Sequence, residues 1–169
     1  GGLNSSIADL SKWVLLHLNH GKYGEGNKKV LFSENVHEEM WTPQTIIPVR
    51  NPGTYNTHFS AYALGFGVSD VKGYKQVTHT GGLEGMVTQI TMIPELNLGI
   101  IVLTNTDYNG FFEAMKSELL DACLGLPYRN YNGFAMNMHE EGEKKRAKTL
   151  KERRDTVAMK IPMAASMDA

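Results

Sequence analysis

The sequence has little of several things that would identify a protein class. It contains one cysteine, Cys123, which excludes an intramolecular disulfide and a cysteine-rich zinc site. Its longest mainly apolar segments, residues 14–18 (which include His17) and 98–103, fall far short of the ~18 residues that a membrane-spanning helix needs. A net charge of −1 predicts neither nucleic acid nor an anionic membrane as a partner. The first residue is Gly and no signal peptide is visible, so a processed product or a fragment is expected.

What the chain does contain is an ordinary globular composition with an uneven distribution of charge. Of its 169 residues, 41% are hydrophobic and 21% are charged, which fits about one packed domain. Residues 140–154 hold seven Lys/Arg and four Asp/Glu, and apolar residues become scarce from about residue 139. We therefore expect a packed body over residues 1–125 and a polar linker or tail over 126–169, helical within 140–158.

Hydrophobic periodicity predicts helices and strands in a definite order. Apolar residues at helical spacing, with serine caps, predict helices over residues 6–19 and 33–41, and a third helix is expected over 111–124. Four strands are predicted between them, after a loop over residues 44–60; they cover residues 62–69, 74–80, 86–93 and 98–104. The last strand is apolar throughout and is expected to be central and covered on both faces. Short connections make neighbouring strands antiparallel, so the fold class is α+β with an antiparallel sheet of about four strands.

The segment most able to carry chemistry is His79-Thr80-Gly81-Gly82, where a strand is expected to end in a glycine-rich turn over 81–85. Glycines let a ligand approach the backbone, and a free N–H at Gly82 could donate to a developing oxyanion. Thr80 supplies a hydroxyl, and an imidazole exchanges protons near neutral pH. From spacing alone, an ordinary hairpin turn is the simpler interpretation.

Five sequence segments, found in a fixed order along the chain, favour a functional interpretation over an ordinary hairpin turn. The triplet His79-Thr80-Gly81 resembles the third motif, Lys-Thr-Gly, of the serine β-lactamase and penicillin-binding protein superfamily, with His in place of Lys. The branch it is similar to includes class C β-lactamases, esterases and D-Ala-D-Ala carboxypeptidase-like hydrolases. The matching segments span about residues 1–125 and are GGLNSS with DLSKW, YALGFG, HTGGLEG, IPE and GIIVLTN.

The resemblance implies an acyl-transfer site on a C-terminal part of a β-lactamase-like fold. In that family a Ser-x-x-Lys serine attacks a carbonyl, and a Tyr-x-Asn tyrosine helps to move the proton. The resemblance implies that His79 and Thr80 face the substrate, that the Gly82 N–H binds the oxyanion, and that Gly81 and Leu83 line the substrate site. It implies no cofactor and no metal. The expected substrates are a β-lactam, a D-amino-acid or peptidoglycan-like peptide, or an ester, and the expected setting is bacterial, periplasmic or extracellular.

The two other family motifs should precede the third, and this chain has only poor local matches. Ser69-Asp70-Val71-Lys72 has the right spelling, but a strand places i and i+3 on opposite faces. Residues 128–130 spell Tyr-x-Asn but follow the third motif. We therefore expect a hydrolase part without its nucleophile, inactive alone, that pairs with an N-terminal part or with a second chain. The alternative is a non-catalytic binding module that keeps the fold.

Three further features receive structural interpretations. His17 and His20 are spaced to share a helix face, but without a carboxylate nearby they are expected to be surface residues and not metal ligands. Residues 107–110 are expected to form a turn and helix cap, because the acidic ligand that a calcium loop requires is misplaced. Cys123 is expected to be a small core residue of the last body helix.

Overall fold

The structure is a computed structural model that describes residues 3–106 and 110–164, with side chains up to residue 159. It confirms the α+β class. Four helices are present in the described part of the chain, together with two short 3₁₀ turns and a small hairpin, β1 (Lys22–Tyr23) with β2 (Lys29–Val30). The helices are α1 (Ile7–Leu18), α2 (Glu34–Trp41), α3 (Phe111–Cys123) and α4 (Tyr131–Ala164).

The sheet is larger than predicted. It has six antiparallel strands in the order β3-β4-β5-β6-β7-β8, so each strand pairs with its neighbours in sequence. The strands are β3 (Thr45–Ile47), β4 (Ser60–Tyr62), β5 (Gly67–Val71), β6 (Tyr74–Leu83), β7 (Met86–Ile93) and β8 (Leu98–Thr104). The expected loop over 44–60 contributes β3 and the start of β4, because three-residue strands are too short to show alternation.

The predicted strand over residues 62–69 is in fact two strands. A tight turn separates β4 from β5: the Ala63 N–H donates to the Phe66 carbonyl at 2.7 Å, and Gly65 has φ +84°. Only glycine adopts that conformation without strain. The alternation of large and small residues across 62–69 therefore reflected two strand ends and a turn.

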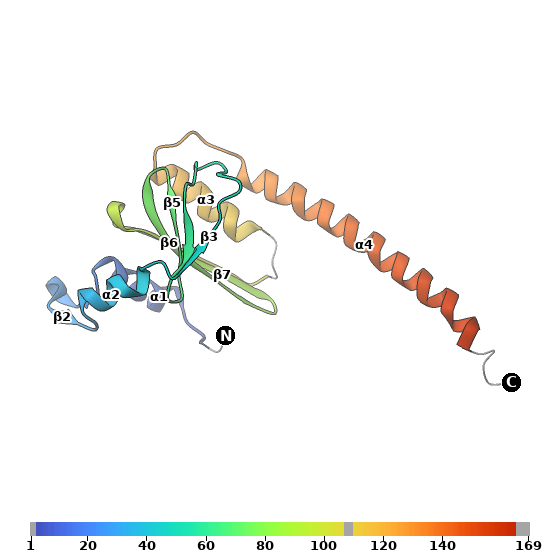
Figure 1. Cartoon of the computed structure of the whole chain (residues 1–169), viewed down its shortest axis with the longest axis horizontal. Coiled ribbons are helices and arrows are strands. Elements are labelled where there is room, and N and C mark those ends of the chain that lie inside the picture. Colours follow the sequence, from blue (N-terminus) through green and yellow to red (C-terminus); the bar gives the residue numbers. More distant parts are fainter. Residues whose placement is uncertain (1–2, 107–109, 165–169) are drawn as a thin grey trace.

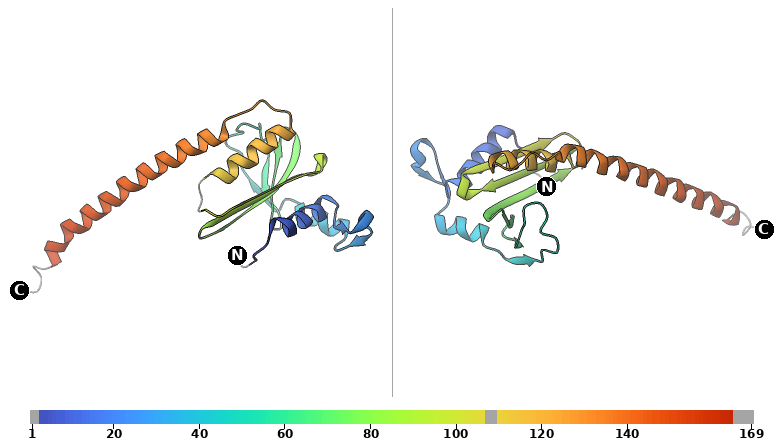
Figure 2. Two further views of the ribbon diagram at one scale, coloured as in Figure 1. Left: turned by 180° about the vertical axis from the view of Figure 1, so that it is seen from behind. Right: turned by 90° about the horizontal axis from the view of Figure 1, so that it is seen from above.

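Helices cover both faces of the sheet, as Figure 2 shows, with α1 and α2 on one face and α3 on the other. On the α1 face, Val14 and Trp41 pack against Val77 and Met92. On the α3 face, Leu120 packs with aliphatic residues of β5, β7 and β8 (Val71, Ile93 and Ile100). The two layers together bury the sheet.

Strand β8 lies at the edge of the sheet and not in its centre, although both of its faces are covered as expected. Helix α1 crosses it closely, since a Cβ on Gly99 would lie 2.3 Å from Cγ1 of Val14. Glycine is needed there for packing and not for a turn. The outer edge of β8 has no partner strand within the described residues.

The predicted helix starts are confirmed. The Ser6 hydroxyl accepts a hydrogen bond from the Asp9 N–H at 3.3 Å, and the Ser33 hydroxyl accepts one from the Val36 N–H at 3.4 Å. Each serine satisfies one of the N–H groups that a helix start leaves free. Two side-chain predictions were wrong: His17 is fully buried between α1 and α2, and Cys123 is exposed.

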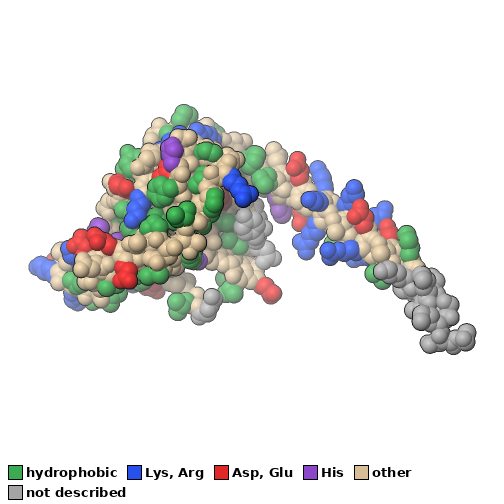
Figure 3. All heavy atoms as spheres, viewed as in Figure 1, with side chains coloured by type: hydrophobic (Ala, Val, Ile, Leu, Met, Phe, Trp, Pro, Cys, Tyr) green, Lys and Arg blue, Asp and Glu red, His purple; other side chains and the backbone are tan. Residues whose placement is uncertain are grey.

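Helix α4 begins nine residues before the predicted helix and is far longer (34 residues). Its first residue is tied to α3, because the buried carboxylate of Asp121 accepts a hydrogen bond from the Tyr131 hydroxyl at 3.0 Å. Beyond that point it extends away from the body in Figure 1, and Figure 3 shows charged side chains of both signs along it. Its apolar residues form no stripe, which is why periodicity underestimated its length.

Candidate functional site

Strand β6 carries the His-Thr-Gly segment and has two unlike halves. Its first half, from Tyr74 to Thr78, pairs with β5 along its whole length, and its last two residues, Val77 and Thr78, also pair with β7. The pairing with β5 stops at Gly67–Thr78, whereas the pairing with β7 continues to Leu83–Met86. The second half, residues 79–83, therefore has an open edge and is exposed.

The prediction of a glycine-rich turn over residues 81–85 was wrong in part, because Gly81 and Gly82 are residues of strand β6. The connection between β6 and β7 is the two-residue turn Glu84-Gly85, in which Gly85 has φ +78°. A Cβ on Gly81 would lie 2.7 Å from Oγ1 of Thr88, so a side chain does not fit there, whereas Gly82 faces open space.

The register decides where the backbone groups of the open half point. Both hairpins of β6 have two-residue connections, and such a hairpin closes on a hydrogen-bonded pair, here Val71–Tyr74 and Leu83–Met86. Because hydrogen-bonded and non-bonded pairs alternate in an antiparallel ladder, odd-numbered residues bond to β7. The N–H and C=O of Thr80 and Gly82 consequently point to the open edge.

The side chains of the open half alternate between the two faces. His79 follows Val77 on the α1 face, and its Nε2 lies 3.0 Å from the hydroxyl of Tyr62. Thr80 lies on the opposite face, across from Gln89 of β7. A substrate can therefore contact both His79 and Thr80 only by lying along the edge between them.

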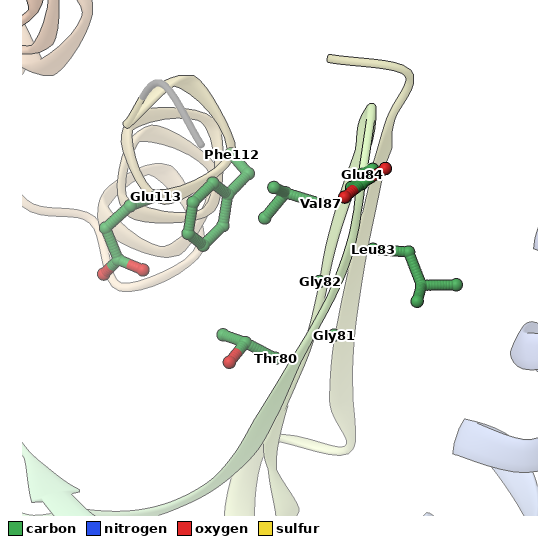
Figure 4. A pocket seen from close by; sticks show the side chains of 8 residues that line it. All are labelled: Thr80, Gly81, Gly82, Leu83, Glu84, Val87, Phe112 and Glu113. Carbon is green, nitrogen blue, oxygen red and sulfur yellow. The ribbon is translucent and has the colours of Figure 1, made fainter. Parts of the chain in front are cut away.

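A hollow of about 630 Å³ lies between the β6–β7 hairpin and the start of α3. Figure 4 shows Thr80 and Val87 directed toward α3, with the Phe112 ring between Glu113 and Val87 in this view, while Leu83 points away from α3. Glu113 accepts a hydrogen bond from the amide of Gln89 at 2.9 Å and forms an ion pair with Lys116. His79 is not part of this hollow.

The two local matches to the other family motifs do not form a nucleophilic site. The Ser69 hydroxyl, on β5, accepts a hydrogen bond from the Gln76 amide at 3.2 Å, while Lys72 lies in the next turn at φ +52°. In the second match, Asn130 caps α4 by accepting a hydrogen bond from the Gly133 N–H at 2.9 Å. Neither match brings a lysine or a tyrosine to a serine.

No group of three or more potential metal ligands occurs among the residues that the structure describes. His17 and His37 lie in an aromatic cluster with Trp41 between α1 and α2, with ring centroids 5.4 Å apart. Burial lowers the pKa of each histidine to about 4; His37 adds to the lowering at His17, and His20 and Lys75 add to it at His37. Two buried neutral rings next to a tryptophan are a packing feature. The possible calcium segment, residues 107–109, lies outside the described residues.

Sequence reasoning missed two side-chain contacts at the His-Thr-Gly segment, Tyr62 with His79 and Gln89 with Glu113. The sequence pattern predicted Tyr62 only as a residue of a strand. Its contact with His79 lies where β4 ends and β5 begins, a break that was not predicted. Gln89 and Glu113 meet across strand and helix, 24 residues apart in sequence. No short-range pattern signals either pair, because the pairing of strands and the packing of α3 on the sheet bring them together.

Comparison with known proteins gives a consistent result. Residues 1–124 match the family model described as Beta-lactamase. Two curated relatives are unguisins hydrolases: ungD' of Aspergillus campestris, 26% identical over 98% of this chain, and ungD of Aspergillus violaceofuscus, 28% identical over 75%. The chain spans 29% and 24% of the lengths of these relatives. These sources are fungal, so they give no support to a bacterial setting.

Among solved structures, the octameric penicillin-binding protein homologue from Pyrococcus abyssi shares the fold. It is 24% identical, with a TM-score of 0.57 over 72% of this chain and 25% of that one. The helices of the described part are too short or too polar to cross a membrane. The family match covers α1 to α3 and the whole sheet, including the open edge of β6. The chain belongs to the Beta-lactamase family of serine hydrolase-like proteins.

Proposed function

We propose that this chain forms one wall of the acyl-transfer site of a serine hydrolase, with the open half of β6 as the contact to substrate. The observation that carries the proposal is the register, which points the Gly82 N–H to the open edge beside the exposed His79. An N–H held by a rigid ladder is a preorganised oxyanion donor. Thr80 and Gly81 border the same edge.

The reaction follows from that placement. A serine hydroxyl, supplied by a segment outside this chain, adds to the carbonyl carbon of a substrate along the edge and loses its proton to a base. The carbonyl oxygen takes up the negative charge and accepts the Gly82 N–H bond. Collapse breaks the bond to the leaving group, which receives a proton, and water then releases the acyl group by the same steps.

This chain supplies no nucleophile in the proposal. Ser69 is on a strand and its hydroxyl accepts a hydrogen bond from the Gln76 amide, while the Lys72 of the matching pattern lies in the next turn. The chain alone should not hydrolyse nitrocefin or p-nitrophenyl acetate above background. Covalent labelling of Ser69 by a fluorophosphonate or a penicillin would contradict this assignment.

Substrate class and location follow from the relatives and the family. The curated relatives are named for the hydrolysis of unguisins, which favours a peptide-like acyl compound; a β-lactam or a small ester is the other choice. A periplasmic or extracellular location is part of the same proposal. Leu83 sits at the end of the open edge and would contact the substrate.

The open edge of β8 provides the proposed place for the rest of the protein. An unpaired apolar strand recruits another strand, and here that strand would come from an N-terminal part or from a second chain. Light scattering tests this: the isolated chain should self-associate with concentration. A strictly monomeric chain at high concentration would contradict the pairing.

The central test is His79→Ala in the longer hydrolase that contains this chain. Loss of a contact to the reacting group should lower turnover by about a hundredfold or more, with the melting temperature almost unchanged because His79 is exposed. Unchanged turnover would remove His79 from the site. If the longer protein has no Ser-x-x-Lys before the family segment, the chain is a binding module and not a hydrolase part.

A further inference from the structure

The side chain of His79 contacts the side chain of one tyrosine, Tyr62. The Tyr62 hydroxyl lies 3.0 Å from Nε2, with ring centroids 6.1 Å apart and ring planes inclined by 59°. Tyr62 ends β4 and pairs with Gly67, the first residue of β5. Because β5 begins there, no strand residue separates Tyr62 from the open half of β6.

The contact is unlike that of His58, which lies in the loop before β4. The His58 Nδ1 faces the carboxylate of Asp70 at 3.0 Å, an acceptor that requires an N–H on the ring nitrogen. A tyrosine hydroxyl is uncharged near neutral pH and can donate its proton. When it donates to Nε2, the ring proton must be on Nδ1.

The N–H at Nδ1 of His79 is then the group that can donate a hydrogen bond to a ligand. Within the part of the chain that the structure describes, the ring of His79 takes part in no hydrogen bond besides the one to Tyr62. The ring is exposed at the open edge. A donor N–H without a charge suits an ester or amide carbonyl, whereas a lysine at this position would suit a carboxylate.

We propose that Tyr62 is a positioning residue that fixes the tautomer of His79, with the proton on Nδ1, and so presents an uncharged donor to an ester or amide carbonyl of the substrate. The inference rests on the proposed function for its substrate part. The tautomer part concerns this chain alone and can be tested without turnover.

The tautomer is tested by long-range ¹H–¹⁵N correlation spectra of the ¹⁵N-labelled chain at about pH 8, which show which ring nitrogen of His79 carries the proton. In the wild type, Nε2 of His79 should resonate as an acceptor nitrogen and Nδ1 as a protonated one. Tyr62→Phe keeps the ring but removes the hydroxyl, and should move the proton towards Nε2. Tyr128→Phe, at a tyrosine that is 78% exposed, is the matched control and should change nothing.

A wild-type spectrum with the proton on Nε2, or the same spectrum in Tyr62→Phe, would overturn the proposal. Tyr62 is 42% exposed, so the phenylalanine variant should fold; Tyr62→Leu is a second variant with the same expected spectrum. Either result stands whether or not the chain belongs to an active hydrolase.

The substrate part is tested in the longer hydrolase with two matched esters, one neutral and one with a free carboxylate. Tyr62→Phe should lower kcat/KM for the neutral ester by about tenfold, and His79→Lys should shift the preference towards the carboxylate ester. Equal losses for both esters in Tyr62→Phe, with the tautomer change confirmed, would reject the substrate part alone. Absence of all turnover in the wild type would instead reject the proposed function.

Discussion

The two halves of β6 belong to one continuous strand but differ in pairing and in burial. In the half from Tyr74 to Thr78, every residue pairs with β5, the last two also pair with β7, and Val77 is fully buried against Trp41. In the half from His79 to Leu83, one edge is open and the side chains are exposed. A strand can thus stabilise the sheet with one half and offer backbone donors to a ligand with the other. The difference arises from where β5 starts, not from β6 itself.

The largest expected effect is a dependence of the free energy of unfolding on pH. It comes from two histidines of α1 and α2, the helices that pack against the buried first half of β6. The pKa of His17 and of His37 is about 4 in the folded chain, against roughly 6.5 when unfolded. The unfolded chain therefore takes up these protons first, so stability is complete above about pH 6.5 and declines as pH falls towards 4. The loss is roughly 3 kcal/mol per histidine.

Urea unfolding between pH 7.5 and 4 measures this effect. Nearby charges act in both directions, since Lys75 and His20 oppose protonation of His37 and Glu34 favours it. His17→Phe should flatten the pH dependence, and His139→Gln, at an exposed histidine of α4, should leave it unchanged. A flat curve in the wild type would contradict the buried neutral pair.

The next effect compares the two halves directly. Val77→Ala removes two buried methyl groups and should cost about 2 kcal/mol of unfolding free energy. Leu83→Ala, at a side chain that is 57% exposed, should change it by less than about 0.5 kcal/mol. Denaturant melts of both variants decide this, and equal losses would mean that the open half is packed as well.

A smaller effect concerns the loop that leads into β4. Oδ1 of Asp70 accepts the N–H groups of His58 and Phe59 at 2.7 and 2.9 Å, and the backbone donors lower the pKa of Asp70 against the effect of its burial. Asp70→Ala should cost about 1.5 kcal/mol, whereas Asp70→Asn keeps an oxygen for both donors and should cost less. Amide exchange at His58 and Phe59 reports the loop, and identical exchange in both variants would exclude the anchor.

The helices could be predicted because their signals are local. A serine cap, an apolar stripe and a terminating glycine predicted α1 to within a residue or two at each end. The split of residues 62–69 and the strand β3 could not be predicted, because pairing partners decide such short strands. The burial of His17 was missed for a similar reason, since α2 and Trp41 cover it from a distant part of the chain.

The position of the proposed site rests on the motif order, whereas the local structure around it was not predicted correctly. The motif order led to the proposal of His79, Thr80 and Gly82 as site residues, and a turn was expected where the strand continues to Leu83. That difference matters, because only a strand gives alternate N–H groups a common direction. The Tyr62 contact was out of reach, since it depends on three strands being in register.

The most direct test of the account uses Gly82, whose N–H should serve the oxyanion and not the ladder. Gly82→Pro removes that N–H, and Gly82→Ala keeps it at a position with open space for a Cβ. In the longer hydrolase, kcat/KM of the proline variant should fall about a hundredfold or more below that of the alanine variant, with similar melting temperatures. Equal kcat/KM values for the two folded variants would contradict the central claim that this edge forms the oxyanion wall.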